Sequence, residues 1–254
     1  MQKRAYKLSK QSVDERDHIH TVDLSVPIPS VVDLTPELPA VLDQGNLGSC
    51  GVNATATCLR HLLHKEGHPD WAPSRLFMYF NTRVNIEGSP ASEDTGVTIR
   101  DVCKSLTKYK VCSETSWPYN IPKFSIKPPP PVYAAAGTHP TVHYAAVAQD
   151  LQTLKATIAS KTPVIFGIQV YSSFESQTVM ETGVVPLPDV NNEQCLGGHA
   201  LLLIGYSDAD QTFRIRNSWG TSVGLPSSPG NFDMPYAYVL DPNLASDFWA
   251  IKLF

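Results

Sequence analysis

The chain has few charged residues and no long apolar run. Only 17% of its 254 residues are charged and the net charge is −4, so we expect no nucleic-acid partner. No window approaches 18 apolar residues, which argues against a membrane-spanning helix and a membrane partner. The basic start Met1–Lys7 is not followed by an apolar stretch, so it does not resemble a secretory signal. These absences favour a cytoplasmic protein, or one exported by a non-classical route.

Cysteine is scarce and odd in number, at five residues. Reduced, mostly buried thiols are therefore the favoured interpretation, and a Cys103–Cys112 bridge stays open as the alternative. The eight histidines lack metal-ligand spacing, so no metal site is expected. A 42% apolar content describes a soluble globule with a substantial core, which we expect to be a monomer.

One of the cysteines stands at the start of a predicted helix. Cys50 precedes the helical pattern Gly51–Glu66, and Ser49 before it is a good N-cap residue. A thiol has a pKa near ~8.5, and the free N–H groups of a helix N-terminus lower that value. We therefore expect an activated thiol here. The predicted helix carries one apolar face, made of Val52, Ala56, Leu59 and Leu63.

A histidine and an asparagine follow far downstream, at His199 and Asn217. His199 has the chemistry to take the thiol proton and pass it to a leaving amine, and Asn217 to orient the imidazole. Gln44 offers a side-chain amide for an oxyanion. Each residue also has a structural interpretation: a buried cysteine, a histidine before a buried strand, an asparagine in a turn. Their occurrence together and in this order favours nucleophilic catalysis.

With these four residues and the sequences around them, the chain resembles the papain family of cysteine peptidases. His199 lies 149 residues after Cys50, and Asn217 lies 18 further on, spacings typical of the family. The resemblance extends from Val32 to the C-terminus and includes Trp117-Pro118-Tyr119 and Asn217-Ser218-Trp219-Gly220. It implies that Gln44 is the oxyanion donor, Cys50 the nucleophile, His199 the base and Asn217 its orienting partner.

The same resemblance implies a set of substrate contacts. The segment Thr95-Gly96-Val97-Thr98 resembles a strip that pairs with substrate backbone, with Thr95, Gly96 and Thr98 as the candidate contacts. Ala200 and Gly167 would line the pocket for the second side chain before the scissile bond. Two further positions complete the expected set: Gly198 stands where the family often has a residue that modulates the histidine, and Trp219 would shield the histidine from water.

Some positions depart from the common papain pattern. Leu47 replaces the usual cysteine three residues before the nucleophile, Gly51 replaces the usual aromatic after it, and Val223-Gly224 replaces a second Trp-Gly. These departures resemble a divergent branch typified by bacterial xylellain-like peptidases.

The expected fold class is α+β, with two lobes and the active site in the cleft between them. The resemblance implies a helical lobe over about residues 44–127 and a β-barrel-like lobe over about 131–254, within a peptidase domain of residues 31–254. The proline run 127–131 would be an extended crossover, because proline does not continue a helix or a central strand. Residues 1–30 are either a short prosegment-like plug over the cleft or a disordered tail.

The chain is therefore predicted to be a cysteine endopeptidase that acts on peptides or proteins without metal or organic cofactor. Made as a zymogen, it would be restrained by its own N-terminal segment. Two alternatives remain open. One is a catalytically silent binding protein with the same fold, and the other is an acyl transferase or ligase that uses the same thiol.

Overall fold

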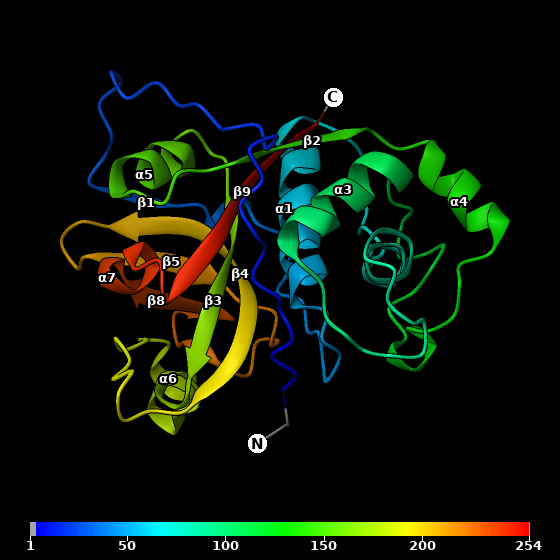
Figure 1. The fold of residues 1–254 in the computed structure, drawn as a ribbon. Helices are drawn as coiled ribbons and strands as arrows, with labels where there is room; N and C mark the ends of the chain where they lie inside the picture. The colour runs from blue at the N-terminus through cyan, green and yellow to red at the C-terminus, as the bar shows by residue number, and fades with distance from the viewer. Residues whose placement is uncertain (1–3, 254) are drawn as a thin grey trace.

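Three helices precede most of the strands in the chain (Figure 1). The computed structural model describes residues 4–253. Helix α1 spans Cys50–Lys65, α2 spans Arg75–Phe80 and continues as a π-helical turn over Asn81–Ile86, and α3 spans Ile99–Tyr109. Helix α1 was predicted from its apolar periodicity. Thr98 caps α3, since its hydroxyl accepts a hydrogen bond from the N–H of Asp101 at 3.2 Å.

A seven-stranded antiparallel sheet forms the other half of the molecule. Its order is β2-β9-β3-β4-β5-β8, and β1 pairs with β4. The bounds of these strands are β1 Val31–Asp33, β2 Val142–Ala146, β3 Val164–Tyr171, β4 Cys195–Ser207, β5 Thr212–Arg216, β8 Asn231–Pro235 and β9 Ala245–Leu253. Strands β6 (Gly224–Leu225) and β7 (Ser228–Pro229) form a separate small hairpin.

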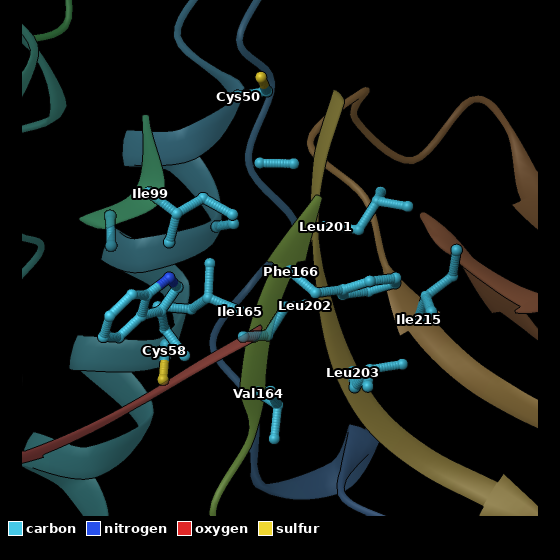
Figure 2. Close-up of a cluster of buried hydrophobic side chains, with 14 of the residues drawn as sticks. Cys50, Cys58, Ile99, Val164, Ile165, Phe166, Leu201, Leu202, Leu203 and Ile215 are labelled. Atoms are coloured by element: carbon cyan, nitrogen blue, oxygen red, sulfur yellow. The ribbon is translucent and has the colours of Figure 1, made fainter. Parts of the chain in front are cut away.

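Helix α1 lies between the sheet and α3 (Figure 1). Of its 16 residues, 13 are buried, so the helix is covered on nearly all sides rather than on the single apolar face that we predicted. Figure 2 shows the apolar side chains of α1, β3 and β4 meeting in one cluster, with Cys50 at one end of it. This packing fixes the N-terminus of α1 against β4, the strand that carries His199.

The proline run does not form an extended crossover throughout. Pro130 and Pro131 open helix α4, which spans Pro130–Gly137, with Pro129 as its N-cap. The prediction was wrong here because the first turn of a helix needs no N–H donor, so proline fits there. The remaining helices are α5 (Leu151–Ala159), α6 (Gln177–Thr182) and α7 (Tyr236–Leu240), together with 3-10 turns at Thr35–Glu37, Ile121–Lys123 and Ser172–Glu175.

All five cysteines are free thiols, and four of them are buried, as expected. Cys103 and Cys112 do not form the alternative bridge. No helix within residues 4–253 is long and apolar enough to cross a bilayer.

Candidate active site

Cys50 is the first residue of α1 and is fully buried. Ser49 occupies the N-cap position, but its hydroxyl does not cap the helix. The Ser49 hydroxyl instead contacts the Tyr119 hydroxyl at 2.7 Å and accepts from the Asn53 amide at 3.0 Å. The free N–H groups of the first turn therefore face the thiol, and those of Cys50 and Gly51 both favour its ionised form.

The predicted base and its partner form a buried pair. The Nε2 atom of His199, in β4, lies 2.9 Å from Oδ1 of Asn217, which follows β5. The same oxygen accepts from the N–H of Ser218 at 2.8 Å, so the amide is held in one orientation. The Trp219 ring stacks on the imidazole with centroids 5.1 Å apart, and covers the pair from solvent. The other imidazole nitrogen, Nδ1, is buried and has no hydrogen-bond partner among the described residues.

The thiol and the imidazole are brought together by α1 and β4. The backbone N–H of Ala200, the residue after His199, reaches the Cys50 thiol. Despite these donors, burial raises the pKa of Cys50 to about 11. Burial also lowers the pKa of His199 to about 4, against the opposing effect of the hydrogen bond that Nε2–H donates to Asn217 Oδ1, and the Arg4 charge lowers this pKa further. The sequence predicted a lowered thiol pKa; in this structure burial outweighs the helix terminus, and both groups are neutral.

Gln44 connects the two halves of the site. Its backbone N–H donates to the Ser218 carbonyl at 2.9 Å, and its Oε1 accepts from the Ser218 hydroxyl at 2.7 Å. One amide proton goes to the Leu47 carbonyl at 3.0 Å, which leaves the second for a ligand. The Tyr119 hydroxyl donates to the Gln44 carbonyl at 2.9 Å. Tyr119, which the sequence offered only as a landmark, thus contacts both the Gln44 backbone and Ser49, the residue before Cys50.

The N-terminal segment, which we define as residues 4–11, runs between α1 and strands β3 and β4 (Figure 1). The N–H of Leu8 donates to the Gly198 carbonyl at 3.0 Å, and the N–H of Ser9 to the Val97 carbonyl at 3.4 Å. The Tyr6 ring meets the His199 imidazole edge-on, with centroids 5.8 Å apart. The Tyr6 side chain therefore packs directly against His199.

Glycines make room for this segment. Gly96 has φ +77°, and a Cβ there would overlap the Lys7 carbonyl oxygen; a Cβ on Gly198 would overlap the Leu8 carbonyl. A Cβ on Gly167 would lie 2.7 Å from the Leu8 side chain, and Gly167 pairs with Ala200 across β3 and β4. Four of the predicted substrate residues, Gly96, Gly167, Gly198 and Ala200, thus lie on or next to one peptide-lined surface.

Two predicted substrate residues use their polar groups elsewhere. The Thr98 hydroxyl caps α3, and its N–H donates to Glu87 Oε1 at 2.8 Å. The Thr95 hydroxyl donates to the Gly96 carbonyl at 3.3 Å. The backbone acceptor for the N-terminal segment in this strip is the carbonyl of Val97, which lies between Gly96 and Thr98, two of the positions named as substrate contacts.

Asp94 and Glu175 also contact side chains of the N-terminal segment. Asp94 Oδ2 lies 3.0 Å from Lys7 Nζ, and Glu175 Oε1 accepts from the Tyr6 hydroxyl at 2.5 Å and lies 3.7 Å from Arg4. The Arg4 guanidinium stacks over the Trp219 ring at 3.9 Å, beside a cavity of about 490 Å³. No sequence pattern linked either acid to the site, because each lies far from its basic partner in the chain.

This fold and arrangement of residues agree with comparisons to known proteins. The model of the family described as papain family cysteine protease matches residues 28–228. An uncharacterized peptidase C1-like protein of Acanthamoeba polyphaga mimivirus is 41% identical over 226 residues, covering 85% of this chain and 71% of that protein. The chain belongs to the papain family of cysteine proteases.

Solved structures give the same result. Xylellain, a cysteine protease from Xylella fastidiosa, is 39% identical with a TM-score of 0.90, and the match covers 100% of this chain and 97% of that one. Digestive procathepsin L2 proteinase from the Tenebrio molitor larval midgut shares the fold, with a TM-score of 0.74 at 17% identity over 98% of this chain and 78% of its own. The predicted family, its xylellain-like branch and the two-lobed α+β fold are confirmed, and the protein is a thiol protease, a hydrolase.

Proposed function

We propose that the chain is an endopeptidase that cleaves peptide bonds through an acyl-enzyme on Cys50. With the N-terminal segment displaced, His199 Nδ1 takes the thiol proton and the sulfur attacks the substrate carbonyl carbon. The C–N bond breaks as the imidazolium gives its proton to the leaving amine. Water, deprotonated by His199, then releases the acid product. Gln44 Nε2 and the Cys50 N–H hold the oxyanion, and Asn217 holds the imidazole.

The single observation that carries this proposal is the free Nδ1 of His199. Within residues 4–253 this buried nitrogen has no hydrogen-bond partner, while Nε2 donates to Asn217 Oδ1. A buried unpaired nitrogen costs free energy, so a purely structural histidine would be expected to have both nitrogens satisfied. A catalytic base needs this atom available for the neighbouring thiol.

We further propose that residues 1–30 are a prosegment-like region that inhibits the peptidase domain of residues 31–254, with lobes near 44–127 and 131–254. The described part of this region passes Trp219 with Arg4, His199 with Tyr6, and Gly167 with Leu8. A substrate would place residues before the scissile bond near Gly167 and its leaving group near Trp219. The N-terminal segment passes Trp219 first and Gly167 later, so its backbone runs in the opposite direction to that of a substrate. A reversed backbone occupies the cleft without presenting its carbonyl for attack. Residues Met1–Lys3 lie outside the described residues.

Intact mass after treatment with an epoxide inactivator of cysteine peptidases tests the reaction. One adduct on the wild-type chain that is lost in Cys50→Ala, but retained in Cys58→Ala, is expected. Peptide hydrolysis that disappears in Cys50→Ala would complete the case. If neither the wild-type chain nor a variant with a displaced N-terminal segment is labelled or active, the silent binding protein would be favoured.

The products of the reaction distinguish acyl transfer from hydrolysis. In the presence of a competing amine, we expect free carboxylic acid as the main product. A predominance of the amide would instead make the protein a transferase or ligase.

A further inference from the structure

We propose that Asp94 selects a lysine or arginine side chain at the substrate residue immediately before the scissile bond, and that Lys7 occupies this subsite in the structure. The inference rests on the proposed function and names the substrate class of the same site. Three observations support it: the Asp94 carboxylate is held in place by its neighbours, it contacts Lys7, and Asp94 and Lys7 both lie beside the turn that carries Cys50.

The Asp94 carboxylate is held in place from two sides. The Tyr79 hydroxyl donates a short hydrogen bond to Oδ1, and the backbone N–H of Gly48 donates to both oxygens at 3.1 and 3.2 Å. Tyr79 is fully buried, and the Asp94 side chain is only 19% exposed. A fixed and partly buried carboxylate attracts a cation more strongly than a solvated one does.

Lys7 satisfies this acid as a basic substrate side chain would. Its Nζ donates to Asp94 Oδ2 at 3.0 Å and to the Asp94 backbone carbonyl at 2.6 Å. Two acceptors converge on one ammonium group, whose own side chain remains 42% exposed. An uncharged side chain in the same place would leave the Asp94 carboxylate without its cation.

The position of Lys7 identifies which substrate residue this subsite serves. Gly48 lies two residues before Cys50, and a Cβ on Gly48 would lie 3.0 Å from Lys7 Cδ. The next residue, Leu8, enters the surface at Gly167 and bonds to Gly198, beside His199. Lys7 therefore lies one residue from the apolar pocket and directly over the nucleophile turn. That is the place of the side chain attached to the attacked carbonyl.

The test compares two peptides that differ only in lysine or norleucine at this position. The full chain carries Lys7→Ala and Leu8→Asp, so that its own segment competes weakly. We expect kcat/KM to favour lysine by roughly tenfold to a hundredfold, the range for a charge-assisted hydrogen bond. Asp94→Asn should reduce the ratio to near one. Asp94→Lys should favour a glutamate peptide.

Glu93→Gln is the matched control, because Glu93 is the exposed neighbour and loses the same charge. It should leave the ratio close to that of the parent. If Asp94→Asn also disturbs the Gly48 turn, both peptides lose rate alike and the ratio still reports the selection. A lysine preference that survives Asp94→Asn, or that is absent in the parent, overturns the inference.

Binding of the same two peptides to the Cys50→Ala form separates this inference from the proposed reaction. One outcome is that the Cys50→Ala protein binds the lysine peptide selectively through Asp94, while the protein that retains Cys50 is neither labelled by the epoxide nor active. That outcome would retain the subsite and reject the endopeptidase. Labelling and turnover with equal use of both peptides would reject the subsite alone.

Discussion

The N–H of Leu8 donates to the carbonyl oxygen of Gly198 at 3.0 Å, so a residue from the start of the chain is bound next to the imidazole of His199. The contact is continued by Ser9 and Val97 on the opposite side. The segment thus binds as an added extended peptide does, through backbone hydrogen bonds, and its side chains add the apolar contact of Leu8, the ring contact of Tyr6 and the ion pair of Lys7. Because the Leu8 side chain enters the surface at Gly167, a charge at position 8 should shift the segment toward the displaced state.

Leu8→Asp should release the N-terminal segment. The substitution removes the apolar contact of the partly buried Leu8 side chain at Gly167, worth about 1 kcal/mol or more, and places a charge there. We expect the epoxide to label Cys50 about tenfold to a hundredfold faster. Val13→Asp is the matched control, since Val13 is 96% exposed, and its labelling rate should equal that of the wild type. Equal rates in both variants would show that residues 4–11 do not guard the thiol.

Mild acid should also favour displacement. His199 has a pKa of about 4 while covered, because of burial, and would return toward about 6.5 when exposed. The displaced state therefore binds more protons between these values, and its population should rise by up to about tenfold per unit as pH falls from 6.5 toward 4. Hydrogen exchange at the Leu8 amide, corrected for its intrinsic pH dependence, measures this. His199→Ala should remove the His199 contribution to the slope; an unchanged slope would contradict the mechanism.

Asn217→Ala should impair turnover more than folding. The variant loses the acceptor for His199 Nε2, a bond that is strengthened when the imidazole is charged, so kcat/KM should fall roughly tenfold to a hundredfold. Steady-state hydrolysis and thermal unfolding of the same protein would be compared. Asn191→Ala, at an exposed position, should change neither. Full activity in Asn217→Ala would remove this residue from the catalytic set.

Leu202→Ala should destabilise the whole molecule. Leu202 is fully buried in β4, in the cluster that joins the sheet to α1 (Figure 2), and its truncation should cost about 2–5 kcal/mol of unfolding free energy. Chemical denaturation measures the loss. Leu187→Ala, at a side chain that is 53% exposed, should stay within about 0.5 kcal/mol of the wild type. A similar loss in both variants would mean that this cluster is not the dominant core.

Much of the fold could be predicted because its signals are local. The helical pattern after Cys50 and the apolar run after His199 became α1 and β4, and both elements are confirmed. The catalytic roles of Cys50, His199, Asn217 and Gln44 stay predictions, although the fold gathers these residues. The predicted extended crossover at the proline run was wrong because proline suits both an extended chain and the first turn of a helix.

The sequence by itself determined the family, the order of cysteine, histidine and asparagine, and the positions of the helix after Cys50 and the strand after His199. Only the tertiary structure decided that Asp94 meets Lys7, that Glu175 meets Arg4, and that the Ser49 hydroxyl turns to Tyr119 instead of capping α1. It also reversed the expected pKa shift of Cys50. The physical reason is that periodicity and motif spacing are properties of neighbouring residues. Burial and ion pairing depend on which distant segments meet.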